Sequence, residues 1–345
     1  MLVREGHPAA PYDQPALAAM IHQVAPESAV DWRLPFNLPI AAILPLVPLT
    51  LLPLDLAFRA WQLVDVAILI LTLLVLQRAY PLGRAGAALG FLGMVASVPA
   101  WSVLTEAQLT PLPVLGGALL VAALRTDGVW LAAAGGLLLA IKPHFLPAYL
   151  IMLVAARRWR PLAAASAGAA ALLLSPLAVG GPAGMEAMLR NALGTNQLVS
   201  IRLTEAWIGD LAVLLPAALV TLVSLALYLG TLAILAAAGA RRPGSAPAFA
   251  AFVLWIGMLA SPHVLPHDLL LLVPPVWLTF WLFREARMAS PVTLLIVVDL
   301  ALLIDLKGVG LVVGPLAMTA VAVWAVVQFR RRAASPQSLH PAAAA

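Results

Sequence analysis

Polar side chains that could do chemistry are concentrated in a few short stretches of this apolar sequence. The stretch "WSVLTEAQLTP" carries Glu106 and Gln108. A carboxylate of this kind can orient or deprotonate a hydroxyl group, and the amide beside it can hold a polar ligand. A solvated turn between two helices is the alternative interpretation of the same pair.

A second stretch, "IKPHFLP", carries Lys142 and His144. An ammonium group at this position would suit a lipid-linked phosphate, because it is a compact point charge. The alternative needs no ligand, since a lysine at a helix end can extend its charged group to a membrane surface.

The third stretch, "LASPHVLPHDLLLLVPP", brings His263, His267 and Asp268 within six residues. The two histidines have the spacing of a helical metal-binding pair. However, Pro266 lies between them and no third ligand is evident, so metal binding is not expected. We expect a hydrogen-bonded turn that lines a cavity.

Residues 181 to 207 are expected to form a long amphipathic loop, and loops of this length in compact proteins are often functional. A merely solvated connector is the alternative. The polar side chains of this loop are those of Arg190, Asn191, Asn196, Gln197, Arg202 and Glu205. The sequence holds no Walker loop, dinucleotide-binding glycine pattern or G-x-S-x-G elbow, so nucleotide hydrolysis and serine chemistry lack support.

The composition indicates the kind of protein that must position these residues. Of 345 residues, 63% are hydrophobic and 10% are charged, and the mean hydropathy is +1.00. A soluble domain needs more surface charge than this, and apolar runs recur along the whole chain, so a polytopic membrane protein is predicted.

The net charge of +5 comes from short clusters between apolar segments, which does not favour nucleic-acid binding. Cysteine is absent, which excludes disulfides.

We predict an all-α bundle with eleven transmembrane helices. The expected spans are 56–77, 85–103, 108–124, 128–141, 144–156, 161–180, 208–237, 246–262, 267–283, 288–304 and 309–329. They imply an external loop and interfacial segment over 1–54, a transmembrane domain over 55–332, and a disordered cytoplasmic tail over 333–345.

Charge bias gives each connection a side of the membrane. Alternate connections hold thirteen of the twenty basic residues, which marks them as cytoplasmic. This alternation of basic and non-basic connections requires a turn between 128–141 and 144–156. Pro143 also disfavours a continuous helix there. Lys142 is therefore expected at a hairpin on the non-cytoplasmic face, with Glu106, the histidine-rich turn and the 181–207 loop on the same side.

Two further features concern helix geometry. The prolines of "LPFNLPIAAILPLVPLTLLPL" (34–54) make a straight spanning helix improbable, so we expect an interfacial or re-entrant element there. Gly86 and Gly90 have the GxxxG spacing that marks close helix packing. The N-terminal residues show no signal-peptide pattern.

Several stretches, in order, resemble glycosyltransferase family 87, integral-membrane enzymes of the GT-C class. "GHPAAPYDQPALAAM" is similar to the family's G-x-P-A-A-L-Y-D-P-A-A-L segment, and "TEAQLTPLPVL" to its G-Q-x-[NT] helix start. "AAGGLLLAIKPHFL" resembles A-G-x-L-L-G-L-x-x-x-K-P, and "ASPHVLPHDLLLLVPP" resembles S-P-[YH]-x-x-x-[YH]-D-L-x-x-L-x-P. The resemblance covers nearly the whole chain.

Two departures from the family pattern affect the expected site. The family's Y-P-P is here "LPFNLP", which weakens any role of that tyrosine. Family members carry a D-F-x-x-[FY] motif after a first transmembrane helix, and its aspartate is the expected catalytic base. This sequence starts at "MLVREGHPAAPYD", beyond that motif. We therefore expect either an upstream start or a truncated member, active or inactive.

The resemblance implies transfer of mannose or a pentose from a polyprenyl-phosphate donor to a glycan or lipid acceptor outside the plasma membrane, with no cofactor or divalent metal. The charge bias of the connections predicts a cytoplasmic C-terminus. The expected phosphate-binding residues are Lys142, His263, His267 and Arg202. The residues that could replace the missing base are Glu106, Asp13 and Asp31. The expected substrate-binding residues are Gln108, His144, Asp268 and Asn196.

Two other functions remain open at this stage. A transporter of lipid-linked substrates would show internal repeats with paired broken helices, and no convincing twofold repeat is seen. A noncatalytic membrane partner in envelope assembly is the other alternative.

Overall fold

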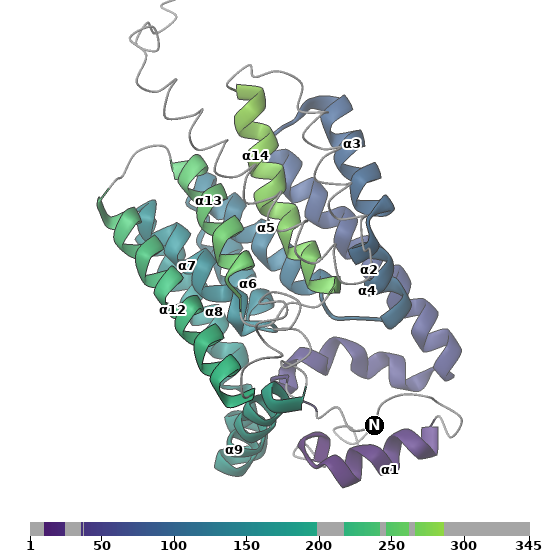
Figure 1. Cartoon of the computed structure of the whole chain (residues 1–345). Coiled ribbons are helices and arrows are strands. Elements are labelled where there is room, and N and C mark those ends of the chain that lie inside the picture. Colours follow the sequence, from purple (N-terminus) through teal and green to yellow (C-terminus); the bar gives the residue numbers. More distant parts are fainter. Residues whose placement is uncertain are drawn as a thin grey trace, which may run out of the picture.

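The protein is helical throughout the part of the chain that the computed structural model describes, which is 10–24, 36, 38–198, 217–241, 246–261 and 266–285. No strand occurs in these residues, so the predicted all-α class is confirmed. The expected spans 288–304 and 309–329 and the tail lie outside them. Figure 1 shows the long helices gathered in one bundle, with α1 (Gln14–Val24) and α9 (Ser175–Leu198) at one end of it.

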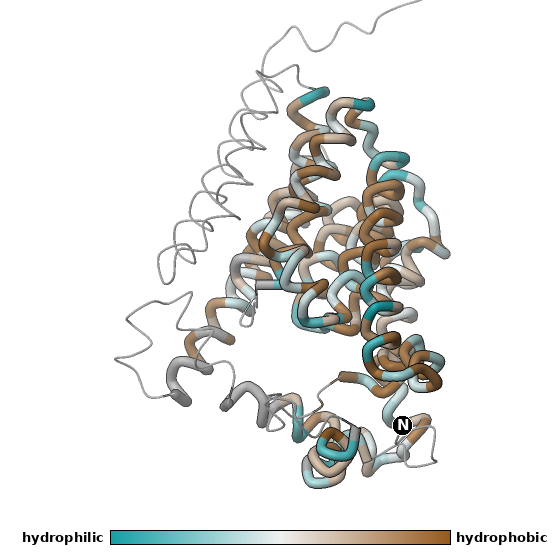
Figure 2. Tube along the Cα trace, turned by 90° about the vertical axis from the view of Figure 1, so that its right-hand side faces the viewer, coloured by the Kyte–Doolittle hydropathy of each residue, from teal (hydrophilic) through white to brown (hydrophobic). Residues whose placement is uncertain are grey.

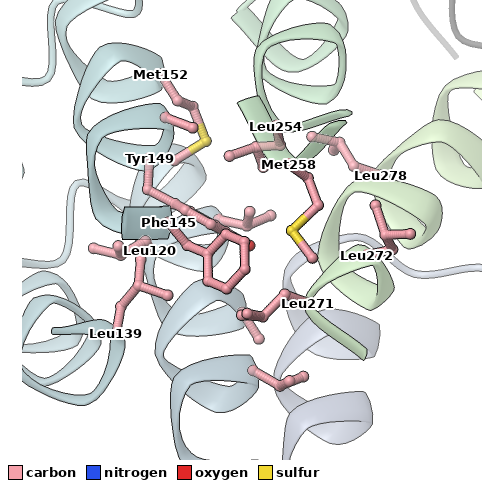
Figure 3. Packing of buried hydrophobic residues seen from close by; sticks show 14 of the residues in the cluster. Leu120, Leu139, Phe145, Tyr149, Met152, Leu254, Met258, Leu271, Leu272 and Leu278 are labelled. Carbon is pink, nitrogen blue, oxygen red and sulfur yellow. The ribbon is translucent and has the colours of Figure 1, made fainter. Parts of the chain in front are cut away.

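A row of packed helices forms the first part of the bundle. Its members, each packed on the next, are α2 (Leu54–Ala79), α5 (Pro111–Thr126), α6 (Val129–Leu139) and α8 (Trp159–Leu173). A second group packs beside it and consists of α7 (Leu146–Ala155), α12 (Ala217–Arg241), α13 (Ala246–Leu259) and α14 (Val273–Glu285). One large apolar cluster joins both groups. In Figure 3, Phe145 and Tyr149 project toward Met258 and Leu271 in this cluster.

Small residues allow the first row to pack backbone against backbone. A Cβ atom added at Gly136 would lie 2.0 Å from the carbonyl oxygen of Ala165, and one at Gly168 would lie 2.0 Å from that of Ala133. Helices α6 and α8 are therefore in direct main-chain contact. The predicted close packing is confirmed at Gly90, where an added Cβ would lie 2.8 Å from the Trp277 ring.

The apolar run that contains Lys142 is broken as predicted. Helix α6 ends at Leu139, a 3₁₀-helix η3 (Pro143–Phe145) follows, and α7 begins at Leu146. In the described part of the segment 34–54, Pro45 and Pro48 lie within a 3₁₀-helix, η2 (Ile40–Leu51), rather than in a straight α-helix.

The prediction of a loop over 181–207 is wrong for 181–198, which are helical. Helix α9 runs over these residues, with a bend at Gly181, whose φ of 63° suits glycine. Pro182 directly after the bend is favourable at a helix start. Helix α9 packs on η2 and on the short 3₁₀-helix η1 (Ala10–Tyr12). The Asn191 side chain donates hydrogen bonds to the carbonyl oxygens of Tyr12 and Phe36, at 3.0 and 3.1 Å.

The described helices differ from the predicted spans in length. Among the helices of the described residues, α2 alone is long and apolar enough to cross a membrane, judged by length and composition. Two bent pairs would add to it if each counts as one span: α3 (Gly83–Ala96) with α4 (Val98–Glu106), at 54°, and α8 with the first part of α9, at 48°. The count of eleven spans and the division into 1–54, 55–332 and 333–345 stay predictions. Figure 2 shows hydrophobic residues along much of the bundle and hydrophilic residues at several helix ends.

Candidate functional site

The three polar stretches singled out in the sequence meet in one cluster, which consists of Glu106, Lys142, His267 and Asp268. The Nδ1 atom of His267 lies 3.1 Å from Oε2 of Glu106. Its Nε2 atom lies 3.6 Å from Oδ1 of Asp268. The ammonium group of Lys142 forms an ion pair with the same Asp268 oxygen. The four side chains therefore lie next to one another, from the carboxylate of Glu106 to the amine of Lys142.

Each of these side chains lies where a helix is interrupted. Helix α4 ends at Glu106, because Ala107 adopts the left-handed conformation (φ 51°). Lys142 lies in the turn between α6 and η3, directly before Pro143. His267 and Asp268 lie in the 3₁₀-helix η4 (Pro266–Leu272), which precedes α14 and packs on α4. The breaks in the apolar helices thus bring the polar residues together.

The side chains of the cluster range from fully buried to about half exposed. The Asp268 side chain is 0% exposed, that of Lys142 is 13% exposed, and that of Glu106 is 48% exposed. Glu106 can therefore meet a ligand, whereas Asp268 cannot do so without rearrangement. Asp268, which was expected to bind substrate, is fully buried and pairs with Lys142.

Glu106 is held from three directions. Besides His267, the Ser102 hydroxyl donates to Oε1 at 2.6 Å, and the Gln108 amide donates to Oε2 at 3.3 Å. Gln108, an expected substrate-binding residue, therefore lies in hydrogen-bond contact with Glu106. Sequence reasoning missed Ser102, although its position one turn before Glu106 on a helix was a usable signal.

Burial and neighbouring charges set the ionisation of the buried pair. Burial, followed by the Lys142 charge, lowers the pKa of His267 below its usual range. Burial alone would raise the pKa of Asp268, but the charges of Lys142, His267 and His144 outweigh it and lower that pKa. At neutral pH, His267 is thus uncharged and Asp268 ionised. Asp268 then balances the charge of Lys142.

Lys142 does not extend freely to a surface, because its amine pairs with buried Asp268. An ammonium group has three N–H donors, so two remain beyond this pair. The partial exposure of the side chain leaves them within reach of a ligand at the site.

Of the other expected site residues, the structure describes the side chains of His144 and Asp13. His144 lies close enough to influence Asp268, and its carbonyl oxygen accepts a hydrogen bond from the Tyr228 hydroxyl of α12. Asp13 is exposed and its carboxylate accepts a hydrogen bond from the Ala16 amide at 3.4 Å, which caps α1. The remaining residues, whose side chains lie outside the described part, are Asp31, Asn196, Arg202 and His263.

A second buried carboxylate, Asp65 in the middle of α2, was also missed. It is 0% exposed, and among the described residues neither of its oxygens has a hydrogen-bond partner. The Trp61 indole nitrogen, one turn away on the same helix face, likewise has none there. An acidic residue within a long apolar helix is itself a signal for function. Within the described residues, no group of three or more His, Asp and Glu side chains could hold a metal ion.

Comparison with known proteins gives one match. The model of glycosyltransferase family 87 matches residues 36–266, which is more than half of the chain. This range includes Glu106 and Lys142 and ends directly before His267. Neither the curated proteins nor the solved structures contain a match. The chain belongs to glycosyltransferase family 87.

Proposed function

We propose that this protein transfers a sugar, mannose or a pentose, from a polyprenyl-phosphate donor to a hydroxyl group of a glycan or lipid acceptor. Membership of the family supports glycosyl transfer. The observation that carries the assignment to a site is the continuous cluster of Glu106, His267, Asp268 and Lys142. It pairs an accessible carboxylate with a cation, which are the two groups that transfer from a phosphate donor needs.

Glu106 acts as the general base in this proposal. As the acceptor oxygen bonds to the anomeric carbon, the bond from that carbon to the phosphate oxygen breaks, and its electron pair leaves with the phosphate. The acceptor proton goes to Glu106, which Ser102, Gln108 and His267 hold in place. A base held in this way typically contributes ~10²–10⁴-fold to the rate.

Lys142 is assigned to the leaving phosphate. Because Asp268 already balances its charge, Lys142 acts mainly as a hydrogen-bond donor to a phosphate oxygen. The remaining charge of the phosphate requires further cations, and Arg202 and His263 stay our candidates for them.

The membrane arrangement belongs to the same proposal. It comprises about eleven transmembrane helices in a GT-C-like bundle in the plasma membrane, an extracytoplasmic active side and a cytoplasmic C-terminus. The apolar helices and the family support a membrane protein. The cluster lies where the charge bias of the connections predicts the non-cytoplasmic side.

Transfer by the purified chain tests the function directly. The chain is placed in lipid nanodiscs with a radiolabelled polyprenyl-phosphate mannose or pentose and a mixture of envelope glycolipids. We expect labelled acceptor and released polyprenyl phosphate, and loss of both in the Glu106→Gln variant. Uptake of the donor into liposomes without any transfer would instead identify a transporter and overturn the proposal.

A further inference from the structure

Helix α2 buries a carboxylate, Asp65, that the proposed mechanism does not use. It is 0% exposed, and neither of its oxygens has a hydrogen-bond partner among the described residues. The Trp61 indole nitrogen, one turn before it, and the Thr110 hydroxyl, directly before α5, are also buried without a partner there. Burial of a polar group without a hydrogen bond lowers stability, and burial of an unpaired charge lowers it far more. The state of these three groups therefore needs a physical explanation.

The packing of α2 on α5 brings Asp65 and Thr110 to one level of the bundle. The two helices pack side by side. Near their ends, the Arg125 guanidinium of α5 donates a hydrogen bond to the carbonyl oxygen of Ala79 in α2. Because both helices end at this contact, they run in the same direction. On α2, Asp65 precedes the contact by as many residues as Pro111 does on α5. Each helical residue adds the same rise, so Asp65 lies level with the start of α5, where Thr110 is.

No counter-charge close to Asp65 lies on the described elements that pack against α2, which are α3, α4, α5 and η2. Their ionisable residues are Arg84, Glu106 and Arg125, and those of α2 itself are Asp55, Arg59 and Arg78. Arg78, Arg84 and Arg125 lie at the end of α2 near Ala79, several turns away. Arg59 is exposed and donates to the Gln62 side chain at 3.1 Å. The two remaining groups, Asp55 and Glu106, are themselves acids, so the surroundings favour an uncharged carboxyl at Asp65.

We propose that Asp65 holds a proton, and that the neutral carboxyl, the Thr110 hydroxyl and the Trp61 indole form one buried hydrogen-bonded site. A protonated carboxyl offers one O–H donor and one carbonyl acceptor, the indole offers only a donor, and the hydroxyl offers both. The indole N–H can therefore donate to the Asp65 carbonyl oxygen, while the Asp65 O–H donates to the Thr110 oxygen, through side-chain rotation or one bridging water. An ionised Asp65 could accept from the same two groups, but it would leave a net charge inside the apolar bundle.

The proton is linked to the proposed base through the turn between α4 and α5. Glu106 is the last residue of α4, and Thr110 directly precedes α5. Before the turn, the Gln62 amide of α2 donates to the carbonyl oxygen of Leu104, at 2.8 Å. Helix α2 thus supports the turn at both ends, and loss of the proton would place a charge in this contact and draw water to it. Asp65 is therefore a positioning residue for Glu106. This consequence, unlike the protonation, rests on the proposed function.

Infrared difference spectroscopy of the full chain in lipid nanodiscs tests the protonation. The spectrum of wild type minus that of Asp65→Asn should contain the C=O stretching band of a protonated carboxyl at neutral pH, and this band should move to lower frequency in D₂O. Asp55→Asn, which changes an exposed carboxyl on the same helix, is the matched control and should remove no such band. Absence of the band from the Asp65 difference spectrum at neutral pH would overturn the proposal.

A chemical probe gives a second measure on the unsubstituted protein. Dicyclohexylcarbodiimide is apolar and adds to a protonated carboxyl: the carboxyl oxygen bonds to the carbodiimide carbon, and the carboxyl proton goes to a nitrogen. We expect an adduct at Asp65 at neutral pH, whereas a water-soluble carbodiimide should modify exposed Glu186 and leave Asp65 intact. An adduct that forms at pH 5 but not at pH 7 would show an ionised carboxyl and overturn the proposal. Protection by sodium chloride but not by choline chloride would also overturn it, because a metal ion would then replace the proton.

The pH profile of sugar transfer tests the link to Glu106. Relative to its own rate at pH 7, wild type should lose kcat at alkaline pH by up to about tenfold per pH unit, the limit for loss of one proton, with little change in KM. Asp65→Asn cannot ionise, so its profile should stay level there. Parallel profiles would overturn the positioning role. Absence of transfer in wild type would refute the proposed function, while the infrared and carbodiimide results would still decide whether Asp65 is protonated.

Discussion

The ion pair between Lys142 and Asp268 joins the turn between α6 and α7 to η4, two points 126 residues apart in the sequence. It anchors one end of the polar cluster, and the same carboxylate also lies beside His267. A buried pair of this kind adds little net stability over apolar packing, but removal of one partner is costly. The first prediction follows from this asymmetry.

Lys142→Met should destabilise the protein by about 3–5 kcal/mol, because it leaves Asp268 charged, fully buried and unpaired. Asp268→Asn should cost less, since Lys142 is 13% exposed and can turn outward. The measurement is reversible unfolding in mixed micelles. Replacing both partners, as in Lys142→Met with Asp268→Leu, should restore most of the loss. A double variant as unstable as Lys142→Met would show that the pair is not the cause.

Glu106→Gln should strongly reduce catalysis without loss of fold. We expect transfer to fall ~10²–10⁴-fold, because the variant cannot take the acceptor proton. Stability should change by less than about 0.5 kcal/mol, since the side chain is 48% exposed. Glu186→Gln on α9 is the matched control, an exposed carboxylate whose partner is Arg190. Equal activity of Glu106→Gln and Glu186→Gln would remove the assigned base.

Stability should depend on pH through His267. Its pKa is lowered in the folded protein, so between that value and the unfolded value of about 6.5 the unfolded chain binds more protons. Stability is therefore complete above pH ~6.5 and falls as the solution becomes more acidic. Asp268, whose pKa is also lowered, adds a second loss below pH ~3.9.

The His267→Gln variant tests the loss of stability that is assigned to His267. Unfolding free energies measured from pH 8 to pH 5 should fall for wild type and stay nearly level for the variant. Parallel pH curves for the two proteins would assign the loss to other groups.

The site was more predictable from the sequence than the helices around it. Charged residues are costly in an apolar bundle, so the few that interrupt it at Glu106, Lys142 and His267 had to share a polar region. Their contact could be anticipated because charge parity placed all three connections on one side. The pairing of Lys142 with Asp268 could not, since it depends on the packing of η4 against α4.

Helix boundaries were less predictable for a physical reason. Hydropathy marks apolar stretches but not the bends within them, so the expected span 161–180 combined the end of α8 at Leu173 with the start of α9. The amphipathic part of α9, which was predicted to be a loop, packs on η1 and η2 and also touches α8 and α12. Asp65 was overlooked because the average hydropathy of the apolar run around it hides a single acidic residue.

The contact between α6 and α8 gives the last prediction. Gly136→Ala should destabilise the protein by at least about 1–3 kcal/mol, because its Cβ would meet main-chain atoms of Ala165, which cannot move aside as a flexible side chain can. Gly230→Ala on α12 should be neutral or slightly stabilising, since an added Cβ meets nothing within 4 Å and alanine favours a helix. Unfolding in mixed micelles measures both variants. Equal stabilities would mean that α6 and α8 are not in main-chain contact in the folded protein.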